Sequence, residues 1–77
     1  MKIEYDREVD ALYIRLQDKN VIRTTEIGEG LNVDFDENGK LIGLEVLGAS
    51  KRYTLSDIFN ISTENLFLED RLAGKAG

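Results

Sequence analysis

The stretch "DFDENGKLIGLE", residues 34–45, decides how the fold is interpreted, because it supports two incompatible structures. It matches the calcium-loop pattern D-x-[DN]-x-[DN]-G, then five residues, then Glu, which an EF-hand places between two helices. The same stretch contains Asn38-Gly39, a strong signal for a β-hairpin because both residues tolerate positive φ. The residues on either side must distinguish a calcium site from a hairpin.

Those flanking residues favour the hairpin. "LNVDFD" (31–36) alternates apolar and polar residues without a fault, and "LIGLEVL" (41–47) continues after the turn as an apolar run. A strand rises about 3.3 Å per residue, so Glu45 would lie some 15 Å from the turn and could not close a calcium cage. What remains of the metal hypothesis is a weak cation site made of three acids: Asp34, Asp36 and Glu37.

The same alternation of apolar and polar residues recurs through the first two-thirds of the chain, in segments that short turn sequences separate. We therefore predict an α+β fold, an antiparallel β-meander of about five strands followed by one or two short C-terminal helices. The predicted strands are 2–5, 11–16, 21–27, 31–36 and 41–47.

Strand 41–47 is apolar on both faces apart from Gly43 and Glu45, so we expect it at the centre of the sheet and covered on both sides. A glycine in mid-strand indicates a bulge or a close approach by another backbone. Glu45 should face solvent or pair with Arg15 or Arg23. The predicted inner face combines strand and helix residues: Ile3, Leu12, Ile14, Leu16, Val33, Phe35, Leu44, Val46, Ile58 and Phe59.

The periodicity changes after the last predicted strand. Thr54, with Asp57 three residues later, resembles a capping box and predicts a helix over about 55–60. Residues 62–77 leave two alternatives open, a second helix through Leu72 or a sixth strand. Their apolar side chains should cover the sheet or contact a second copy or another protein, which makes four of them interface candidates: Leu66, Phe67, Leu68 and Leu72.

The composition limits the class of protein. Seventy-seven residues form one domain, and a chain with no Cys and no His has neither disulfides nor the usual zinc ligands. A formal net charge of −5 disfavours nucleic acids and anionic membranes as partners. No apolar run approaches 18 residues and the N-terminus lacks a signal-peptide core. We expect a cytoplasmic protein without a cofactor.

The sequence also argues against enzymatic activity, because the commonest general base and strongest nucleophile, His and Cys, are both absent. A catalytic serine–lysine pair is also disfavoured. The candidates, Ser50 and Lys51, are adjacent in the sequence, and adjacent side chains point in different directions in most backbones. A second acidic stretch, "YDREVD" (5–10), reads as an exposed turn. Its alternative is half of a divalent-cation site, built from Asp6, Glu8 and Asp10.

Two blocks, "YDREVDALYIRL" (5–16) and "DFDENGKLIGLEVLGAS" (34–50), resemble a family of short prokaryotic proteins known as domain-of-unknown-function family 2283. The resemblance implies a small β-rich domain of unassigned activity, with an antitoxin-like role for some members. In such a family the Asp-x-Asp-x-x-Gly stretch at 34–39 looks like a hairpin signature rather than a helix-loop-helix.

From these observations we expect a non-enzymatic protein-interaction module, a homodimer that also binds a basic, toxin-like protein. An acidic chain suits a basic partner because opposite potentials speed their encounter. The alternative function is a small cation- or ligand-binding protein that uses its acidic hairpin loops.

Overall fold

The computed structural model describes residues 1–64, so the four interface candidates between Leu66 and Leu72 lie outside the described residues. The described part is an antiparallel sheet followed by two short helices, which confirms the predicted fold class. The elements are β1 (Lys2–Asp6), β2 (Ala11–Arg15), β3 (Arg23–Gly28), β4 (Leu31–Phe35), β5 (Leu41–Leu47), α1 (Ala49–Arg52) and α2 (Leu55–Phe59).

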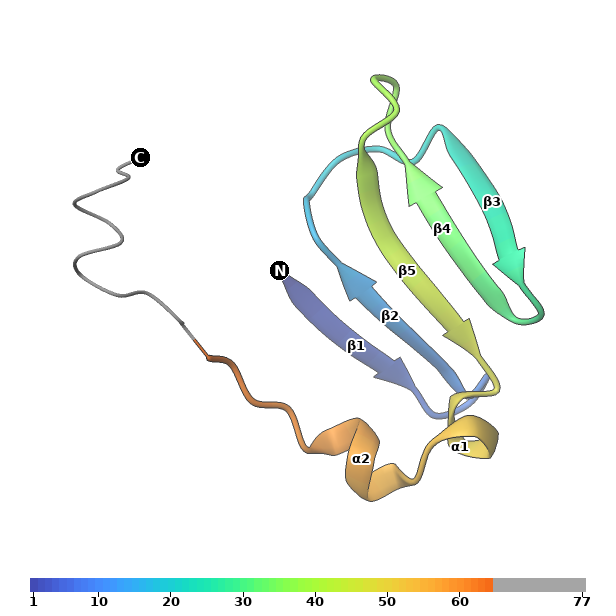
Figure 1. The fold of residues 1–77 in the computed structure, drawn as a ribbon, viewed down its shortest axis with the longest axis vertical. Coiled ribbons are helices and arrows are strands. Elements are labelled where there is room, and N and C mark those ends of the chain that lie inside the picture. Colours follow the sequence, from blue (N-terminus) through green and yellow to red (C-terminus); the bar gives the residue numbers. More distant parts are fainter. Residues whose placement is uncertain (65–77) are drawn as a thin grey trace.

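The order of the strands differs from the consecutive order of a simple meander. The sheet runs β1-β2-β5-β4-β3, so that β5 lies between β2 and β4 (Figure 1). The connection of residues 16–22 crosses from β2 to the far edge, and β3, β4 and β5 then return as hairpins. Consecutive order would have left the most apolar strand at an edge. The prediction that 41–47 is central is confirmed, whereas the prediction of a continuous meander was wrong.

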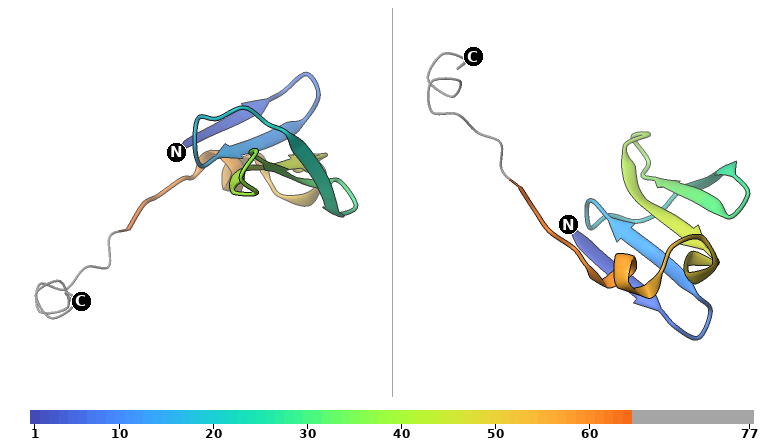
Figure 2. Two further views of the ribbon diagram at one scale, coloured as in Figure 1. Left: turned by 90° about the horizontal axis from the view of Figure 1, so that it is seen from above. Right: turned by 60° about the horizontal axis from the view of Figure 1, so that its bottom comes forward.

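The inner face of the sheet carries the core. Ile42 is completely buried on β5, and Val46 packs with Ala49 of α1 and Ile58 of α2 in a small cluster. Both helices lie at the end of the sheet where β5 finishes (Figures 1 and 2). They therefore cover one part of the inner face.

The predicted inner face holds for both helix residues, which reach different depths. Ile58 is buried in the cluster, whereas Phe59 contacts Tyr5 of the inner face and stays 60 % exposed, since α2 has only five residues. The expectation that β5 is covered on both sides was wrong. Its outward positions include Gly43 and Glu45, and among the described residues no helix covers that face.

The start of α2 confirms the predicted cap. The Thr54 hydroxyl accepts a hydrogen bond from the backbone N–H of Asp57 at 3.0 Å, which satisfies one free donor of the first turn. The helix ends at Phe59, one residue before the predicted boundary. Within residues 1–64, no helix has the length and apolar character needed to cross a membrane.

Candidate functional site

An apolar groove lies between the inner face of the sheet and α2. It has a volume of about 220 Å³ and its walls come from β1, β2 and the segment 53–61. Asp57 is the one charged side chain among the described residues that line it. The apolar lining consists of Ile3, Leu12, Ile14, Tyr53, Ile58 and Ile61.

Apolar side chains around this groove extend it towards solvent. Tyr53 is 51 % exposed, Ile61 55 % and Phe59 60 %, so more than half of each side chain stays in contact with water. The Phe59 ring stacks edge-on against Tyr5 of β1 with 5.7 Å between the ring centres. We call the groove and these exposed residues the α2 surface.

A hydrogen-bond cluster around Asp10 holds the helices against the sheet. The Asp10 carboxylate accepts from the Tyr5 hydroxyl at 2.6 Å, from the Ser50 N–H at 2.9 Å and from the Ser50 hydroxyl at 2.8 Å. The Asp10 carbonyl also accepts from the N–H of Ala49 at 3.0 Å. These bonds join the β1–β2 turn to α1 and so fix where α2 begins.

The same cluster perturbs the two titratable groups in it. The hydrogen bond from Tyr5, followed by that from the Ser50 N–H, lowers the pKa of Asp10. The hydrogen bond to Asp10 in turn raises the pKa of Tyr5. Asp10 has φ 56, a conformation that Asp tolerates better than most residues, so its position is strained and well anchored.

The opposite, outer face of the sheet is polar, and its centre is Tyr13. A Cβ atom placed on Gly43 would lie 2.6 Å from Cζ of Tyr13 and 2.7 Å from the Ile14 carbonyl oxygen, so the phenol ring rests directly on the glycine backbone. The Tyr13 hydroxyl donates to Asp34 at 2.7 Å. Thr24 donates to the other oxygen of the same carboxylate at 2.6 Å.

This arrangement shifts the titration of Tyr13. Burial, then the hydrogen bond to Asp34 and the charge of that carboxylate, raise the pKa of Tyr13 to about 12. The phenol therefore stays protonated at neutral pH and is a hydrogen-bond donor. An open groove of about 380 Å³ surrounds it, with acids from three strands in its walls: Glu4, Asp6, Asp34 and Glu45.

The sequence left open whether Glu45 faces solvent or pairs with an arginine, and the structure shows its surroundings. It lies half-buried on the outer face, as predicted, and its carboxylate accepts from the amide of Asn32 on β4 at 3.3 Å. The cross-strand neighbour of Glu45 on β4 is Asn32, and on β2 it is Tyr13. Neither predicted basic partner forms an ion pair with Glu45: Arg15 lies over the Tyr13 ring and Arg23 over the Phe35 ring.

The predicted calcium-loop residues form a hairpin turn. The Asp36 carbonyl accepts from the Gly39 N–H at 3.0 Å, and the Asp36 N–H donates to the Lys40 carbonyl at 2.9 Å. Gly39 has φ 79 and Asn38 does not have positive φ. This is a three-residue loop with a left-handed glycine. The predicted hairpin is therefore confirmed, and of the two turn residues that tolerate positive φ only Gly39 adopts it.

The structure does not bring the three acids of the weak cation candidate together. The Asp36 carboxylate accepts from the backbone N–H groups of Asn38 at 2.9 Å and Lys40 at 2.8 Å, and these bonds lower its pKa. Asp34 points instead to Tyr13 on the outer face, and Glu37 is exposed. In residues 1–64, no three acids converge in a way that could hold a metal ion.

The second acidic stretch is also a turn. Asp6 accepts from the backbone N–H groups of Glu8 and Val9 at 2.9 Å and 3.4 Å, while Asp10 is held in its cluster. Sequence reasoning did not identify the roles of Asp10 and Tyr13. Gly43 was the available signal for Tyr13, because a glycine in mid-strand indicated close approach. The neighbour proved to be an aromatic ring and the carbonyl of the adjacent strand.

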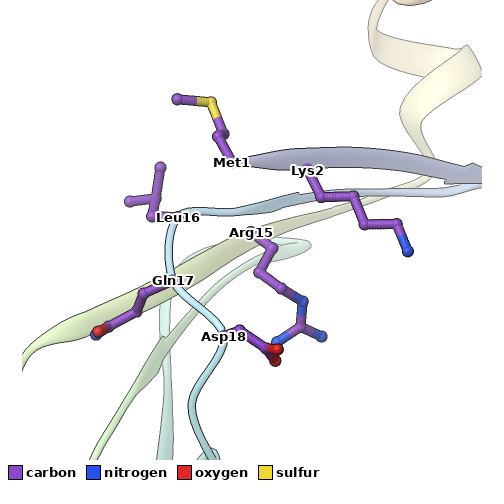
Figure 3. Close-up of a pocket in the computed structure, with 6 residues that line it drawn as sticks. All are labelled: Met1, Lys2, Arg15, Leu16, Gln17 and Asp18. Carbon is purple, nitrogen blue, oxygen red and sulfur yellow. The ribbon is translucent and has the colours of Figure 1, made fainter.

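A third hollow, of about 260 Å³, lies where β1 begins and β2 ends. Figure 3 shows Met1 and Leu16 pointing to one side of the sheet there, and Lys2 and Arg15 to the other. Lys2 lies directly opposite Arg15 in the sheet. Like charges at opposed positions destabilise strand pairing.

Comparisons with known proteins show the family of this chain and assign no activity. The sequence model of the family described as "Protein of unknown function (DUF2283)" matches residues 2–50. The uncharacterized protein MJ0789 of Methanocaldococcus jannaschii is 38% identical over 55 residues, which are 71% of this chain and 47% of that protein. The chain thus spans about half the length of this relative. No solved structure matches the chain.

Proposed function

Since this chain belongs to the protein family of unknown function DUF2283, we propose its function from the structure: it is a non-enzymatic module that binds other protein chains through the α2 surface. The observation that supports this proposal is the exposure of Tyr53, Phe59 and Ile61 around an apolar groove. Contiguous apolar patches on small soluble domains commonly mark sites of protein–protein contact.

The shape and chemistry of the α2 surface suit a protein better than a small molecule. The groove is shallow and open, and it continues into exposed side chains outside its walls. Aromatic residues such as Tyr53 and Phe59 are enriched at the centres of protein interfaces. Small-molecule sites instead enclose most of the ligand and place several polar groups inside.

The described residues offer little support for catalysis. The Ser50 hydroxyl donates to Asp10, and the Tyr13 hydroxyl donates to Asp34. Both groups are thus already used within the fold. A nucleophile also needs a base positioned to take its proton, and neither hydroxyl has a histidine or a lysine as a hydrogen-bond partner in residues 1–64.

The partner that we propose is a basic protein, in an antitoxin-like role within the cytoplasm. The net charge of −5 would speed encounter with a chain of opposite charge. The family resemblance suggests the same class of partner. The charged groove around Tyr13 adds to the negative potential, and the α2 surface would supply the apolar contact.

Co-purification with the product of the adjacent gene tests the proposal. The tagged full chain and the untagged neighbour are co-expressed, and the complex is isolated at moderate salt. We expect Ile61→Asn to weaken the complex at least tenfold, because one desolvated apolar anchor contributes more than 1 kcal/mol at many interfaces. Val9→Asn is the matched control, because Val9 is a 64 % exposed aliphatic residue outside the α2 surface.

The result that contradicts the proposal is equally specific. If the neighbour does not bind and the chain remains a monomer at several hundred micromolar, the protein is not an interaction module of this kind. Equal weakening by Val9→Asn and Ile61→Asn would move the contact away from the α2 surface.

A further inference from the structure

The strand β1 is an edge of the sheet with backbone groups available for pairing. Within residues 1–64, β1 pairs with β2 and with no other strand, and Figure 1 shows it at one border of the sheet. Edge strands of this kind are covered, blunted or paired with another chain in native proteins. Which of these applies to β1 depends on its sequence.

The opposite edge is a poorer candidate for pairing. The register of β3 shifts between Glu26 and Gly28, and such a bulge twists an edge and interrupts regular bonding. Laid antiparallel against itself, the sequence "RTTEIG" (23–28) also places no acid opposite a base in either register centred on Thr24 or Thr25. β1 carries no such irregularity in its pairing with β2.

We propose that two copies of this chain pair antiparallel through β1, with Ile3 on the two-fold axis, so that their sheets become continuous. This inference deepens the proposed function, on which it rests, by naming a second copy as one partner. In this register Lys2 lies opposite the partner's Glu4, and Glu4 opposite the partner's Lys2. "KIEY" (2–5) is therefore complementary to itself in charge when read antiparallel.

The position of Lys2 strengthens this charge argument. Inside one chain, Lys2 lies opposite Arg15 across the β1–β2 pair, so two basic residues occupy opposed positions. The ion pair from Lys2 to Glu4 of its own strand is 3.4 Å long and exposed. A carboxylate from the partner on the free side of β1 would compensate the positive pair.

The apolar face continues across the same axis. A two-fold axis perpendicular to the sheet keeps the inner face of both copies on one side. Ile3 lines the groove of the α2 surface together with Ile61, and Tyr5 stacks on Phe59. Met1, opposite the partner's Tyr5, would extend this apolar contact. The two α2 surfaces thus meet at the axis and add area that one short strand pair lacks.

A charge exchange tests the pairing in the full chain. Lys2→Glu places two acids opposite each other twice per dimer. We therefore expect the dissociation constant of the dimer to rise roughly tenfold. Lys2→Glu combined with Glu4→Lys restores both opposite-charge pairs and should return the dissociation constant to within about twofold of the wild type. Lys40→Glu, an equal charge change at an exposed turn, is the control and should have no effect.

A disulfide tests the register. The chain has no Cys, and opposed residues of paired strands lie within the Cα distance that a disulfide needs. Ile3→Cys should therefore give a covalent dimer under mild oxidation, whereas Glu4→Cys should not. The proposal is overturned if only Glu4→Cys gives a covalent dimer, or if neither variant gives one. Neither variant would cross-link if β1 paired with another segment of its own chain.

The outcomes separate this inference from the function on which it rests. If the neighbouring gene product binds through Ile61 but neither cysteine variant cross-links, the β1 pairing is wrong and the interaction module stands. A dimer that is weakened by Ile61→Asn but unaffected by Lys2→Glu likewise overturns the β1 pairing. If no association of any kind occurs, both proposals fall.

Discussion

The two faces of the sheet are stabilised in different ways. On the inner face, apolar side chains pack around Ile42 and Val46, and the short helix α2 leaves part of this face in contact with water. On the outer face, polar groups satisfy one another, with Tyr13 donating to Asp34 and Asn32 to Glu45. Among the described residues no buried side-chain polar atom lacks a hydrogen-bond partner.

This difference bears on which face would gain more free energy from contact with another chain. Polar groups that are already hydrogen-bonded gain little free energy when another chain covers them. A hydrogen bond within a protein and a hydrogen bond to water differ little in free energy. An apolar face left exposed gains free energy in proportion to the area that a partner covers. We therefore propose association at the inner face and its β1 edge.

The largest effect is expected from the inner face. Ile42→Ala removes three carbons from the largest fully buried side chain of the described residues, which is 0 % exposed. We expect a loss of about 3 kcal/mol in the free energy of unfolding, because the cavity cannot collapse under a central strand. Urea denaturation measures it. A loss below about 1 kcal/mol would show that β5 is not the centre of the core.

A somewhat smaller effect is expected on the outer face from Gly43→Ala. The added methyl group must displace the Tyr13 ring and also meets the Ile14 carbonyl, which belongs to the neighbouring strand. We expect a loss of about 2 kcal/mol. In the background of Tyr13→Ala the same substitution should cost less but should still destabilise, since the carbonyl contact remains. Equal costs in both backgrounds would contradict the close contact between ring and glycine.

Tyr13→Phe keeps the ring on Gly43 and removes only its hydrogen bond. The expected loss is about 1 kcal/mol. The wild type should also lose stability at high pH. The pKa of Tyr13 is about 12 in the folded chain and near 10 when unfolded, so this contribution is complete below pH 10 and disappears as the pH rises through 12.

Absorbance titration of the three tyrosines checks this shift. A component with a pKa near 12 should be present in the wild type and missing in Tyr13→Phe. If this component survives the substitution, the assignment to Tyr13 is wrong.

The smallest effect is expected in the hairpin turn. Asp36→Asn preserves an oxygen that accepts the N–H groups of Asn38 and Lys40, so stability at neutral pH should change less than in Tyr13→Phe. The lowered pKa of Asp36 means that its contribution is present above pH 3.8 and is lost as the pH falls through the lower folded value. Thermal melting below pH 4 should therefore be less pH-dependent in the variant. An unchanged acid limb would contradict this role.

Several parts of the fold follow from local sequence. Alternation specified the strands, Thr54 and Asp57 specified the start of α2, and Gly39 specified the hairpin. These features depend on neighbours within a few residues. The apolar residues on both faces of 41–47 also indicated a central strand, because apolar residue types are the ones that become buried.

The parts that were missed depend on contacts distant in the sequence. The pairing of β2 with β5 joins strands that are far apart in the chain, and no local pattern distinguishes it from consecutive pairing. Asp10 looked like one acid in an exposed turn, yet its partner Ser50 is 40 residues away. Tyr13 looked like an outward residue, and only the β2–β5 register brings its ring onto Gly43.

Sedimentation velocity of the unmodified full chain measures the proposed association through β1. We expect a reversible shift, over a concentration range from about 1 to several hundred micromolar, from the mass of one 8.7 kDa chain to twice that mass. Lys2→Glu should move this transition to higher concentration. A single species with the mass of one chain across the whole range would contradict association through the β1 edge.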